Sequence, residues 1–424
     1  MKKLTYIVLT LGIAVASFAA APLSLEDALS LALQNNYNIK QVKNSTEIME
    51  KTAIPGNAGL LPSVSLSAGV NYADNTISGM QTQSTTNTAT LSAQYLLFDG
   101  FGNVYTYKKL KSQSEQAVVE EKSAIEGTLL VVAQSFLSTS LARDNMDAAK
   151  DQLDISQENF DKQKSKYDLG NLNKLNYLNA QVNLNADEIT YMNAVQSYEE
   201  QKRALNVLLG RDPETELDVL AYSVAYNDYS ISELAKEVFA NNPTLKSAEM
   251  DLDQSKLELK SARSDYWPTV ALTGSYGYNQ TESDLTVAMD NPNTSFSAGL
   301  NISWDLFTGR RNAQTQISKI TLKNSELALD AEKLSLLENI NNLYTAYENS
   351  LVVLDKQIQN LELAQLNFDQ TKDYYDQGLV TSTQFREAQL NLTNSKISIS
   401  QARNSTYMYD FQIMQISGKL LEQQ

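Results

Sequence analysis

The chain has 424 residues and carries 34 lysines and arginines against 50 aspartates and glutamates, a formal net charge of −16. It contains neither cysteine nor histidine, which excludes disulfide bonds, thiol or imidazole catalysis, a lipid-modified cysteine and an ordinary zinc site. An acidic chain also lacks the basic surface that nucleic-acid binding needs. With only 16 glycines and 7 prolines, the chain has few breakers, so we expect long uninterrupted elements.

Residues 1–21 have the layout of a secretory signal peptide. Lys2 and Lys3 precede an apolar run over residues 6–16, and small residues follow. The run is shorter than the roughly 20 residues that a membrane-spanning helix needs. We expect no further apolar stretch of that length, so membrane residence would come from strands or from a peripheral contact.

The remaining chain is predicted to be one unit repeated twice, with a first structural repeat at 22–230 and a second at 231–424. The pair Asn35-Asn36 recurs as Asn241-Asn242, and Gly170 recurs as Gly378 at the end of a shared Tyr-Asp-x-Gly segment. Such landmarks keep their order along the chain. A unit of about 200 residues is longer than the repeats of a solenoid, so we expect an internal pseudo-twofold relation.

Each repeat is predicted to begin with a helix and to continue with two strands. Apolar residues alternate with small polar ones after Pro62 and Pro268, and again over 88–97 and 296–306. Each stretch has the length of about ten residues that a tilted membrane-crossing strand needs. The polar segments that join the strands, 73–87 and 280–294, are expected to be loops. The residues expected to face lipid are Val64, Leu66, Val70, Tyr72, Leu91, Tyr95, Val270, Leu272, Tyr276, Tyr278, Phe296, Leu300, Ile302 and Trp304.

The core of a β-sandwich is the alternative interpretation of these strands. Their second face carries serine, threonine, glycine and asparagine instead of charges, which favours a barrel lumen. Four strands cannot close a membrane barrel, because the smallest have about eight and an open edge in lipid is not tolerated. We therefore expect an oligomer. A trimer would supply twelve strands, although the pattern alone leaves two or four copies open.

Two long helices are predicted after each strand pair. Residues 103–169 contain no proline and one glycine, and residues 311–377 contain neither, which predicts helices of about 65 residues, roughly 100 Å long. From Phe385 to Ile416 apolar residues recur at steps of three and four, as in a coiled coil. The expected fold class is an α+β membrane protein in which a long antiparallel coiled-coil helical barrel carries four transmembrane β-strands per chain.

The element order, the repetition and the junctions Leu97-Phe98-Asp99-Gly100 and Leu306-Phe307-Thr308-Gly309 resemble the TolC-like outer-membrane efflux proteins. The resemblance covers the whole mature chain. It implies a homotrimer with a twelve-stranded barrel in outer-membrane lipid of a Gram-negative-type cell and a twelve-helix tunnel in the periplasm. It also implies a passive exit duct, without cofactor or metal, that docks to a periplasmic adaptor and an inner-membrane transporter for tripartite efflux or type I secretion.

By resemblance, the turns between the long helices are the tips that contact the adaptor. A glycine after a helix supplies the left-handed cap that reverses the chain. For the apolar tip residues, packing within the tip is the alternative. The predicted contact residues are Gly170, Leu172, Gly378, Leu379 and Val380.

The resemblance also places a closed periplasmic entrance next to the second tip. The predicted entrance residues are Asn176, Tyr375, Gln384 and Glu387. The family has acids at the last two positions, but only Glu387 is an acid here, and the usual arginine is replaced by Val380. We therefore expect a weaker cation-binding ring and a lower barrier to opening. An ordinary exposed helix charge is the alternative for Glu387.

A secreted or surface trimeric coiled-coil adhesin is the alternative function. It predicts strands near one terminus, whereas here they lie within each repeat. A soluble periplasmic chaperone would not need apolar strand faces. The chain is not expected to be an enzyme, since no nucleophile has a recognisable base partner. Drugs, metals, siderophores and polypeptides all stay open as cargo.

Overall fold

The computed structural model describes residues 22–77, 80–171, 173–223, 225–283 and 292–421, so the predicted signal peptide lies outside the described residues. The first half of the chain contains α1 (Leu25–Asn35), α2 (Tyr37–Thr52), β1 (Ser63–Ile77), β2 (Met80–Phe98), α3 (Gly102–Asp168) and α4 (Lys174–Leu208). The second half contains α5 (Ile231–Asn241), α6 (Pro243–Ser264), β3 (Thr269–Ser283), β4 (Asn293–Ser303), α7 (Gly309–Asp376) and α8 (Ser382–Ile416). The two halves therefore list the same elements in the same order.

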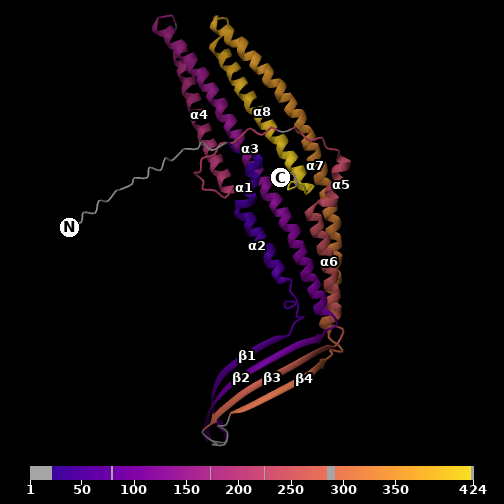
Figure 1. Cartoon of the computed structure of the whole chain (residues 1–424). Coiled ribbons are helices and arrows are strands. Elements are labelled where there is room, and N and C mark those ends of the chain that lie inside the picture. The colour runs from indigo at the N-terminus through magenta and orange to yellow at the C-terminus, as the bar shows by residue number, and fades with distance from the viewer. Residues whose placement is uncertain (1–21, 78–79, 172, 224, 284–291, 422–424) are drawn as a thin grey trace, which may run out of the picture.

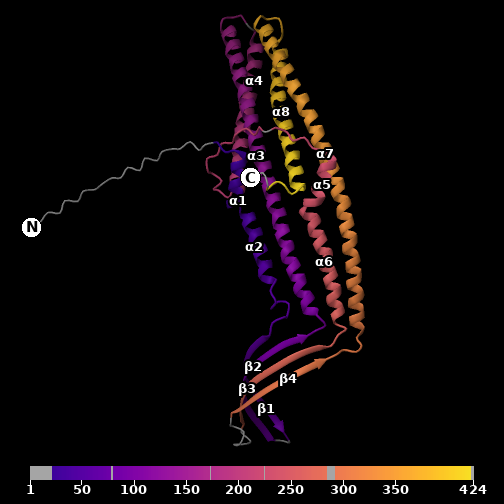
Figure 2. The same ribbon diagram turned by 45° about the vertical axis from the view of Figure 1, so that its right-hand side comes forward.

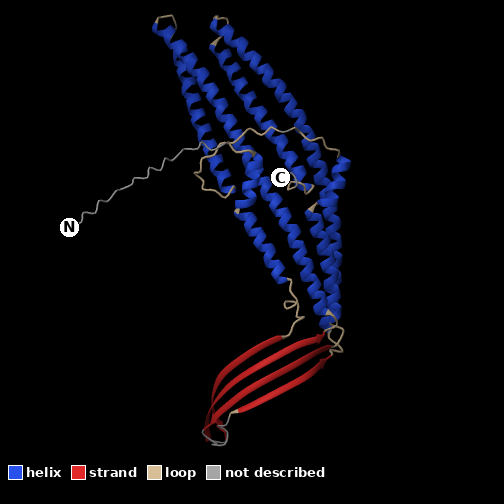
Figure 3. Ribbon diagram, in the orientation of Figure 1, coloured by secondary structure: helices blue, strands red, loops and turns tan. Residues whose placement is uncertain are grey.

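The strands and the helices occupy opposite ends of an elongated molecule. The four strands form one curved sheet, and the helices extend from it to the two hairpin tips, α3–α4 and α7–α8 (Figure 1). The turned view in Figure 2 shows α3 and α7 running nearly the full length of the helical part. Figure 3 shows that helix and strand do not mix along this axis.

The sheet has the order β1-β2-β3-β4, and every neighbouring pair is antiparallel. Strands β1 and β4 therefore form its two edges. The expected loop over 73–87 is wrong, because β1 continues to Ile77 and β2 begins at Met80. Backbone pairing continues through this polar stretch, and its threonines are β-branched residues that suit a pleated surface. Likewise, β3 continues to Ser283, and residues 284–291 of the second expected loop lie outside the described residues.

The predicted long helices are confirmed. α3 has 67 residues and α7 has 68, while α4 and α8 have 35 each and end midway along them. Two large core clusters lie in this middle region, and Phe136 and Tyr347 are fully buried in them. Contrary to our expectation, α3 contains one window apolar enough to cross a membrane, but 56% of that window is buried. Its buried residues, such as Leu129, pack in the core instead.

Asn36 joins two helices end to end in the first half. Its Oδ1 accepts hydrogen bonds from the backbone N–H groups of Asn38 and Ile39, at 2.8 and 3.2 Å, at the start of α2. Its Nδ2 donates to the carbonyl of Leu208, the last residue of α4, at 2.7 Å. Helix ends leave backbone groups unpaired, and one buried side chain here satisfies groups at two of them.

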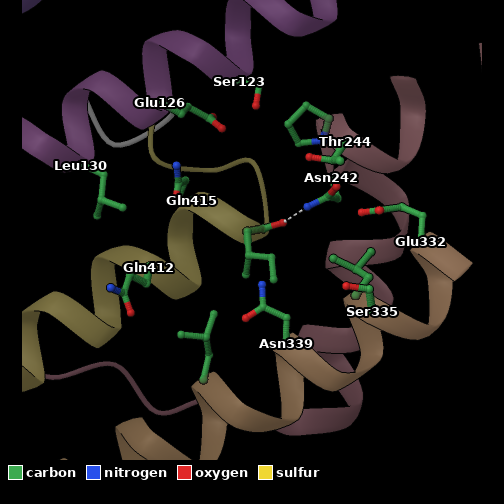
Figure 4. A pocket seen from close by; sticks show the side chains of 14 residues that line it. Ser123, Glu126, Leu130, Asn242, Thr244, Glu332, Ser335, Asn339, Gln412 and Gln415 are labelled. Carbon is green, nitrogen blue, oxygen red and sulfur yellow. Dashed lines mark hydrogen bonds between the residues drawn. The ribbon is translucent and has the colours of Figure 1, made fainter. Parts of the chain in front are cut away.

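Asn242 repeats this arrangement in the second half. Its Oδ1 accepts from the N–H of Leu245 in α6 at 3.0 Å, and its Nδ2 donates to the carbonyl of Ile416 at the end of α8 at 2.9 Å. The bond lies beside a cavity of about 480 Å³ that Glu126, Asn339 and Gln415 help to line (Figure 4). Each half thus aligns a tip helix with a helix that continues towards the sheet.

Candidate functional site

The predicted lipid-facing residues within the strands share one face of the sheet, and Trp304 follows the end of β4. Leu66 pairs with Leu91, Leu91 with Tyr276 and Tyr276 with Phe296, so the apolar rows continue across all four strands. Except for Val270, which is half-buried, these side chains are between 36% and 78% exposed. The folded protomer therefore presents a broad exposed apolar surface.

The opposite face of the sheet is polar and neutral. Ser65, Ser92, Ser275 and Ser297 occupy one register row across the four strands, and the hydroxyls of Ser275 and Ser297 lie 2.8 Å apart. Among the described strand residues, the charged side chains are Asp74 and Glu282, and both have the register of the apolar face. Hydroxyl and amide groups without charges thus cover the polar face.

The two predicted tips have the expected geometry. Gly170 and Gly378 take φ values of 75° and 77°, and apart from their chain neighbours no described residue has an atom within 4 Å of where a Cβ would lie on either glycine. The left-handed backbone, and not crowding, therefore favours glycine here. Leu379 is 67% exposed and Val380 is half-buried. Leu172 lies outside the described residues.

Tyr375, at the tip end of α7, is held by contacts that the sequence did not predict. Its ring stacks on Phe385, with centroids 4.6 Å apart, and its hydroxyl accepts a hydrogen bond from Gln163 Nε2 at 3.0 Å. Burial raises the pKa of the Tyr375 hydroxyl. Asn176 lies at the start of α4, where its N–H donates to Asn173 Oδ1 at 2.9 Å. The hydrogen bonds of the described residues do not join the side chains of Asn176 and Tyr375.

Gln384 and Glu387 have different surroundings although they are one turn apart. Gln384 forms a capping box at the start of α8. Its Oε1 accepts from the Thr381 N–H at 2.9 Å, and its own N–H donates to Thr381 Oγ1 at 3.3 Å. Glu387 is exposed. Of the two, therefore, only Glu387 has a side chain uncommitted to helix capping.

The strongest polar contact near the tips was missed from the sequence. Asp187 of α4 is 1% exposed, and Arg386 of α8 donates to both of its oxygens, at 2.5 and 2.7 Å. Gln152 and Ser156 of α3 each donate to the same carboxylate at 2.5 Å. Gln389 Nε2 then donates to Ser156 Oγ at 3.0 Å. We call these five residues the Asp187 cluster. Among these five residues the sequence offers a signal only at Gln389, because Ala388-Gln389 repeats Ala180-Gln181.

Exposed ion pairs join α3 to the α7–α8 hairpin on either side of the Asp187 cluster. On the tip side, Lys162 lies 3.3 Å from Asp376, and Lys372 lies 3.3 Å from Glu158. We call these two pairs the tip ties; each joins α3 to α7, and their side chains are 36–48% exposed. On the other side, Lys396 of α8 lies 2.6 Å from Asp151 of α3.

A second buried acid lies in the middle region. Asp410 of α8 accepts from the Tyr229 hydroxyl at 2.6 Å and from Asn227 Nδ2 at 3.0 and 3.1 Å. The Tyr347 hydroxyl of α7 donates to the Asn227 carbonyl at 2.7 Å. Burial raises the pKa of the Asp410 carboxyl, against the effect of these hydrogen bonds. Asn227 and Tyr229 belong to the linker between α4 and α5, so these bonds attach the linker to α7 and α8.

The chain is similar to a described protein family and to several known proteins. A family model described as outer membrane efflux protein matches residues 28–211 and again residues 234–419. Outer membrane protein TolC of Vibrio cholerae is 21% identical over 436 residues, which covers 100% of this chain and 97% of that protein. Alkaline protease secretion protein AprF of Pseudomonas aeruginosa is 23% identical over 351 residues, 78% of this chain and 71% of that protein.

Solved structures share the fold. The Campylobacter jejuni CmeC outer membrane channel superposes with a TM-score of 0.78 at 18% identity, over 93% of this chain and 86% of that chain. The open state of the Neisseria gonorrhoeae MtrE outer membrane channel gives a TM-score of 0.74 at 18% identity, over 93% of this chain and 89% of that chain.

Proposed function

The chain belongs to the outer membrane efflux protein family, and we propose that three copies of it form the exit duct of a tripartite efflux or type I secretion system. It is a passive channel protein of the outer membrane of a Gram-negative-type cell, with its helices in the periplasm, and not an enzyme. The family description supports efflux, and the relative named for secretion of alkaline protease supports polypeptide export. The resemblance that the sequence indicated is confirmed.

The observation that carries the proposal is a sheet with one exposed apolar face, one neutral polar face and two unpaired edges. In lipid, every strand edge must be paired, so β4 of one copy would pair with β1 of the next. The alternating directions of the four strands make that pairing antiparallel. Three copies would give the twelve strands of one closed barrel, with the hydroxyl rows facing the lumen.

The helices at the two margins of the protomer support the same assembly. α7 packs on α5, α6 and α8, while α4 packs on α3, so α7 and α4 each leave one side open. Large apolar side chains are exposed on both. On α7 they include Ile320, Leu334 and Leu363, and on α4 they include Val182, Ile189 and Met192. In a ring of copies, α7 would pack against α4 and α2 of its neighbour.

The finer assignments belong to the same proposal and rest on the sequence pattern and the family resemblance. The halves 22–230 and 231–424 would be two structural repeats of one unit, preceded by a signal peptide at 1–21. The tips at Gly170, Leu172, Gly378, Leu379 and Val380 would contact a periplasmic adaptor that links the duct to an inner-membrane transporter. Asn176, Tyr375, Gln384 and Glu387 would surround the periplasmic entrance.

A deletion strain tests the function. Its susceptibility to dyes, bile salts and antibiotics is compared with the proteins that it releases into the medium. Hypersensitivity with unchanged secretion indicates efflux, and loss of a secreted protein with normal susceptibility indicates type I secretion. An unchanged phenotype in both assays, with the wild-type chain expressed, would contradict an exit duct.

The mass of the detergent-extracted protein tests the assembly separately. After correction for bound detergent, we expect the mass of three chains. A mass of one or two chains would overturn the trimer. Glu387→Ala is the corresponding test of the entrance. If cations block the bilayer conductance of Glu387→Ala as they block that of wild type, Glu387 does not belong to the entrance.

A further inference from the structure

We propose that Leu334 of one copy fills an apolar site on the neighbouring copy, formed there by Tyr37, Val131 and Val207. The occupant of this site is therefore a second copy of the same chain. The inference rests on the proposed function, because it needs the ring of copies and the two structural repeats. It adds the contact that fixes where along its length α7 lies against its neighbour.

A cavity inside one chain shows how such a site is built. The cavity of about 480 Å³ lies where α8 ends and α6 begins (Figure 4). α3 and α7 line it through residues such as Glu126 and Asn339, and α8 and α6 line it through Gln415 and Pro243. Two of its lining side chains are carboxylates, those of Glu126 and Glu332. The cavity inside the chain is therefore polar and acidic.

The proposed repeats place a counterpart of this cavity between copies. Asn36 corresponds to Asn242, and each bonds the end of one helix to the start of the next, so α4 meets α2 as α8 meets α6. In the first repeat, α3 takes the place that α7 has beside the cavity. The place of α3 then falls to α7 of a neighbouring copy. The counterpart is complete only when two copies meet.

The counterpart is more apolar than the cavity. Asn36 and Asn242 are 206 residues apart, and Gly170 and Gly378 are 208 apart, which gives the offsets before the strands and within the long helices. Both carboxylates are replaced, and Glu338 is the one acid among the counterparts of the lining residues. The four counterparts that form the proposed contact, each after its cavity residue, are Glu126 and Leu334, Pro243 and Tyr37, Asn339 and Val131, and Gln415 and Val207.

Exposure in the single chain supports an additional partner at these positions. Leu334 is 69% exposed, and Tyr37, Val131 and Val207 are 70%, 49% and 56% exposed. Glu126, at the position that corresponds to Leu334, is fully buried. The same helix position is thus covered in one repeat and open in the other. Because burial of apolar side chains is favourable, Leu334 would be covered by the equivalent elements of a second copy.

A neighbouring turn shows the same difference. Leu129 of α3 is fully buried, whereas Leu337 of α7, 208 residues later, is 39% exposed. Both positions lie in the middle of the helical part, away from the sheet (Figure 1). Membrane lipid would be at the sheet, so it does not cover them in the proposed assembly. A second copy is the occupant that the repeat supports.

A disulfide between copies tests the site, because the native chain has no cysteine. The test protein carries Leu334→Cys with Val207→Cys. In one chain α4 packs on α3, while α7 packs on α5, α6 and α8, so a bond between these cysteines has to join two copies. The matched control carries Leu327→Cys with Val207→Cys. Leu327 is 58% exposed and lies on the same face of α7, two turns and roughly 10 Å away.

After mild oxidation of the detergent-extracted proteins, we expect covalently joined copies on a denaturing gel for the test protein alone. A reductant should return them to single chains. Equal joining in the test and control proteins, or no joining in a test protein that has the mass of three chains, would overturn the site. A wild-type mass of one or two chains would instead contradict the proposed assembly.

Leu334→Glu tests the contact without a cross-link, since it gives α7 the residue that α3 has at Glu126. A carboxylate placed among apolar side chains loses its hydration, so the trimer should dissociate at a protein concentration at least about tenfold higher than wild type. The control is Leu169→Glu, at a position 76% exposed at the end of α3. Both variants should keep the helical circular dichroism of wild type. Dissociation of both variants at the same concentration would overturn the site.

Discussion

The middle of the helical part and its tips are stabilised in different ways. In the middle, two large apolar clusters surround fully buried side chains such as Phe136 and Tyr347, and the buried side chains of Asn36 and Asn242 satisfy backbone groups at helix ends. At the tips, one small cluster and exposed ion pairs join the hairpins. One continuous helix such as α3 is therefore fixed over one part of its length and loosely held over another.

The largest effect is expected at the boundary between these regions. Asp187→Ala leaves Arg386 partly buried without its partner and should destabilise the protein by about 3–5 kcal/mol. Asp151→Ala, in the exposed pair with Lys396, should cost at most about 1 kcal/mol. Denaturant unfolding of the detergent-solubilised protein measures both. Equal losses of unfolding free energy in the two variants would contradict the difference between the buried and the exposed ion pair.

The next effect belongs to the middle region. Asn242→Ala leaves the Ile416 carbonyl unpaired and removes the cap of α6, so we expect a loss of about 1–3 kcal/mol. Asn36→Ala should cost a similar amount, because its contacts match. The control is Asn173→Ala at the exposed tip, where a lost N-cap costs about 1 kcal/mol. Hydrogen exchange at the C-terminal ends of α4 and α8 should rise only in the first two variants.

The two regions are expected to respond to pH with opposite signs. Asp410 has a raised pKa because it is buried, so its contribution to stability is full below the ordinary aspartate pKa of about 3.9 and is lost as the pH rises through the raised value. The unfolding free energy of wild type minus that of Asp410→Asn should therefore fall as the pH rises through this range. A flat difference would contradict the burial of this carboxylate.

Glu158 at the tip gives the reverse dependence. Its hydrogen bond from Lys162 is the main cause of its lowered pKa. Its contribution is therefore full above the ordinary glutamate pKa of about 4.3 and is lost as the pH falls through the lowered value. The unfolding free energy of wild type minus that of Glu158→Gln should therefore fall on acidification. The same sign for Glu158 and Asp410 would contradict this comparison of tip and middle.

The smallest effect is expected from the tip ties themselves. Lys372→Ala removes an exposed pair with Glu158 and should change the unfolding free energy by less than about 1 kcal/mol. If this tip borders the channel entrance, as proposed, Lys372→Ala should nevertheless raise the bilayer conductance, because the tip is held by few other contacts. A change in stability with no change in conductance would place this ion pair away from the entrance.

Local periodicity predicts those features of the fold that depend on a single helix or strand. Alternation around Leu66 and Tyr276 predicted strands, and the absence of breakers predicted α3 and α7. The polar stretch 73–87 was mistaken for a loop, because its threonines and glutamines have no apolar alternation even though their backbone pairs. The Asp187 cluster depends on the axial stagger of two hairpins. Asp187 stands 17 residues after Gly170, whereas Arg386 stands 8 after Gly378, and spacing within one helix does not encode that offset.

The unpaired edges of β1 and β4 have a genetic consequence. If three copies close one barrel, a subunit with a defective edge loses the strand pairing with one neighbour, and the barrel cannot close around it. A cell that makes normal and defective chains together then builds mostly mixed rings, so the normal allele cannot compensate. Substitutions at these edges should therefore behave as dominant mutations, whereas a substitution that only prevents synthesis of the chain should be recessive.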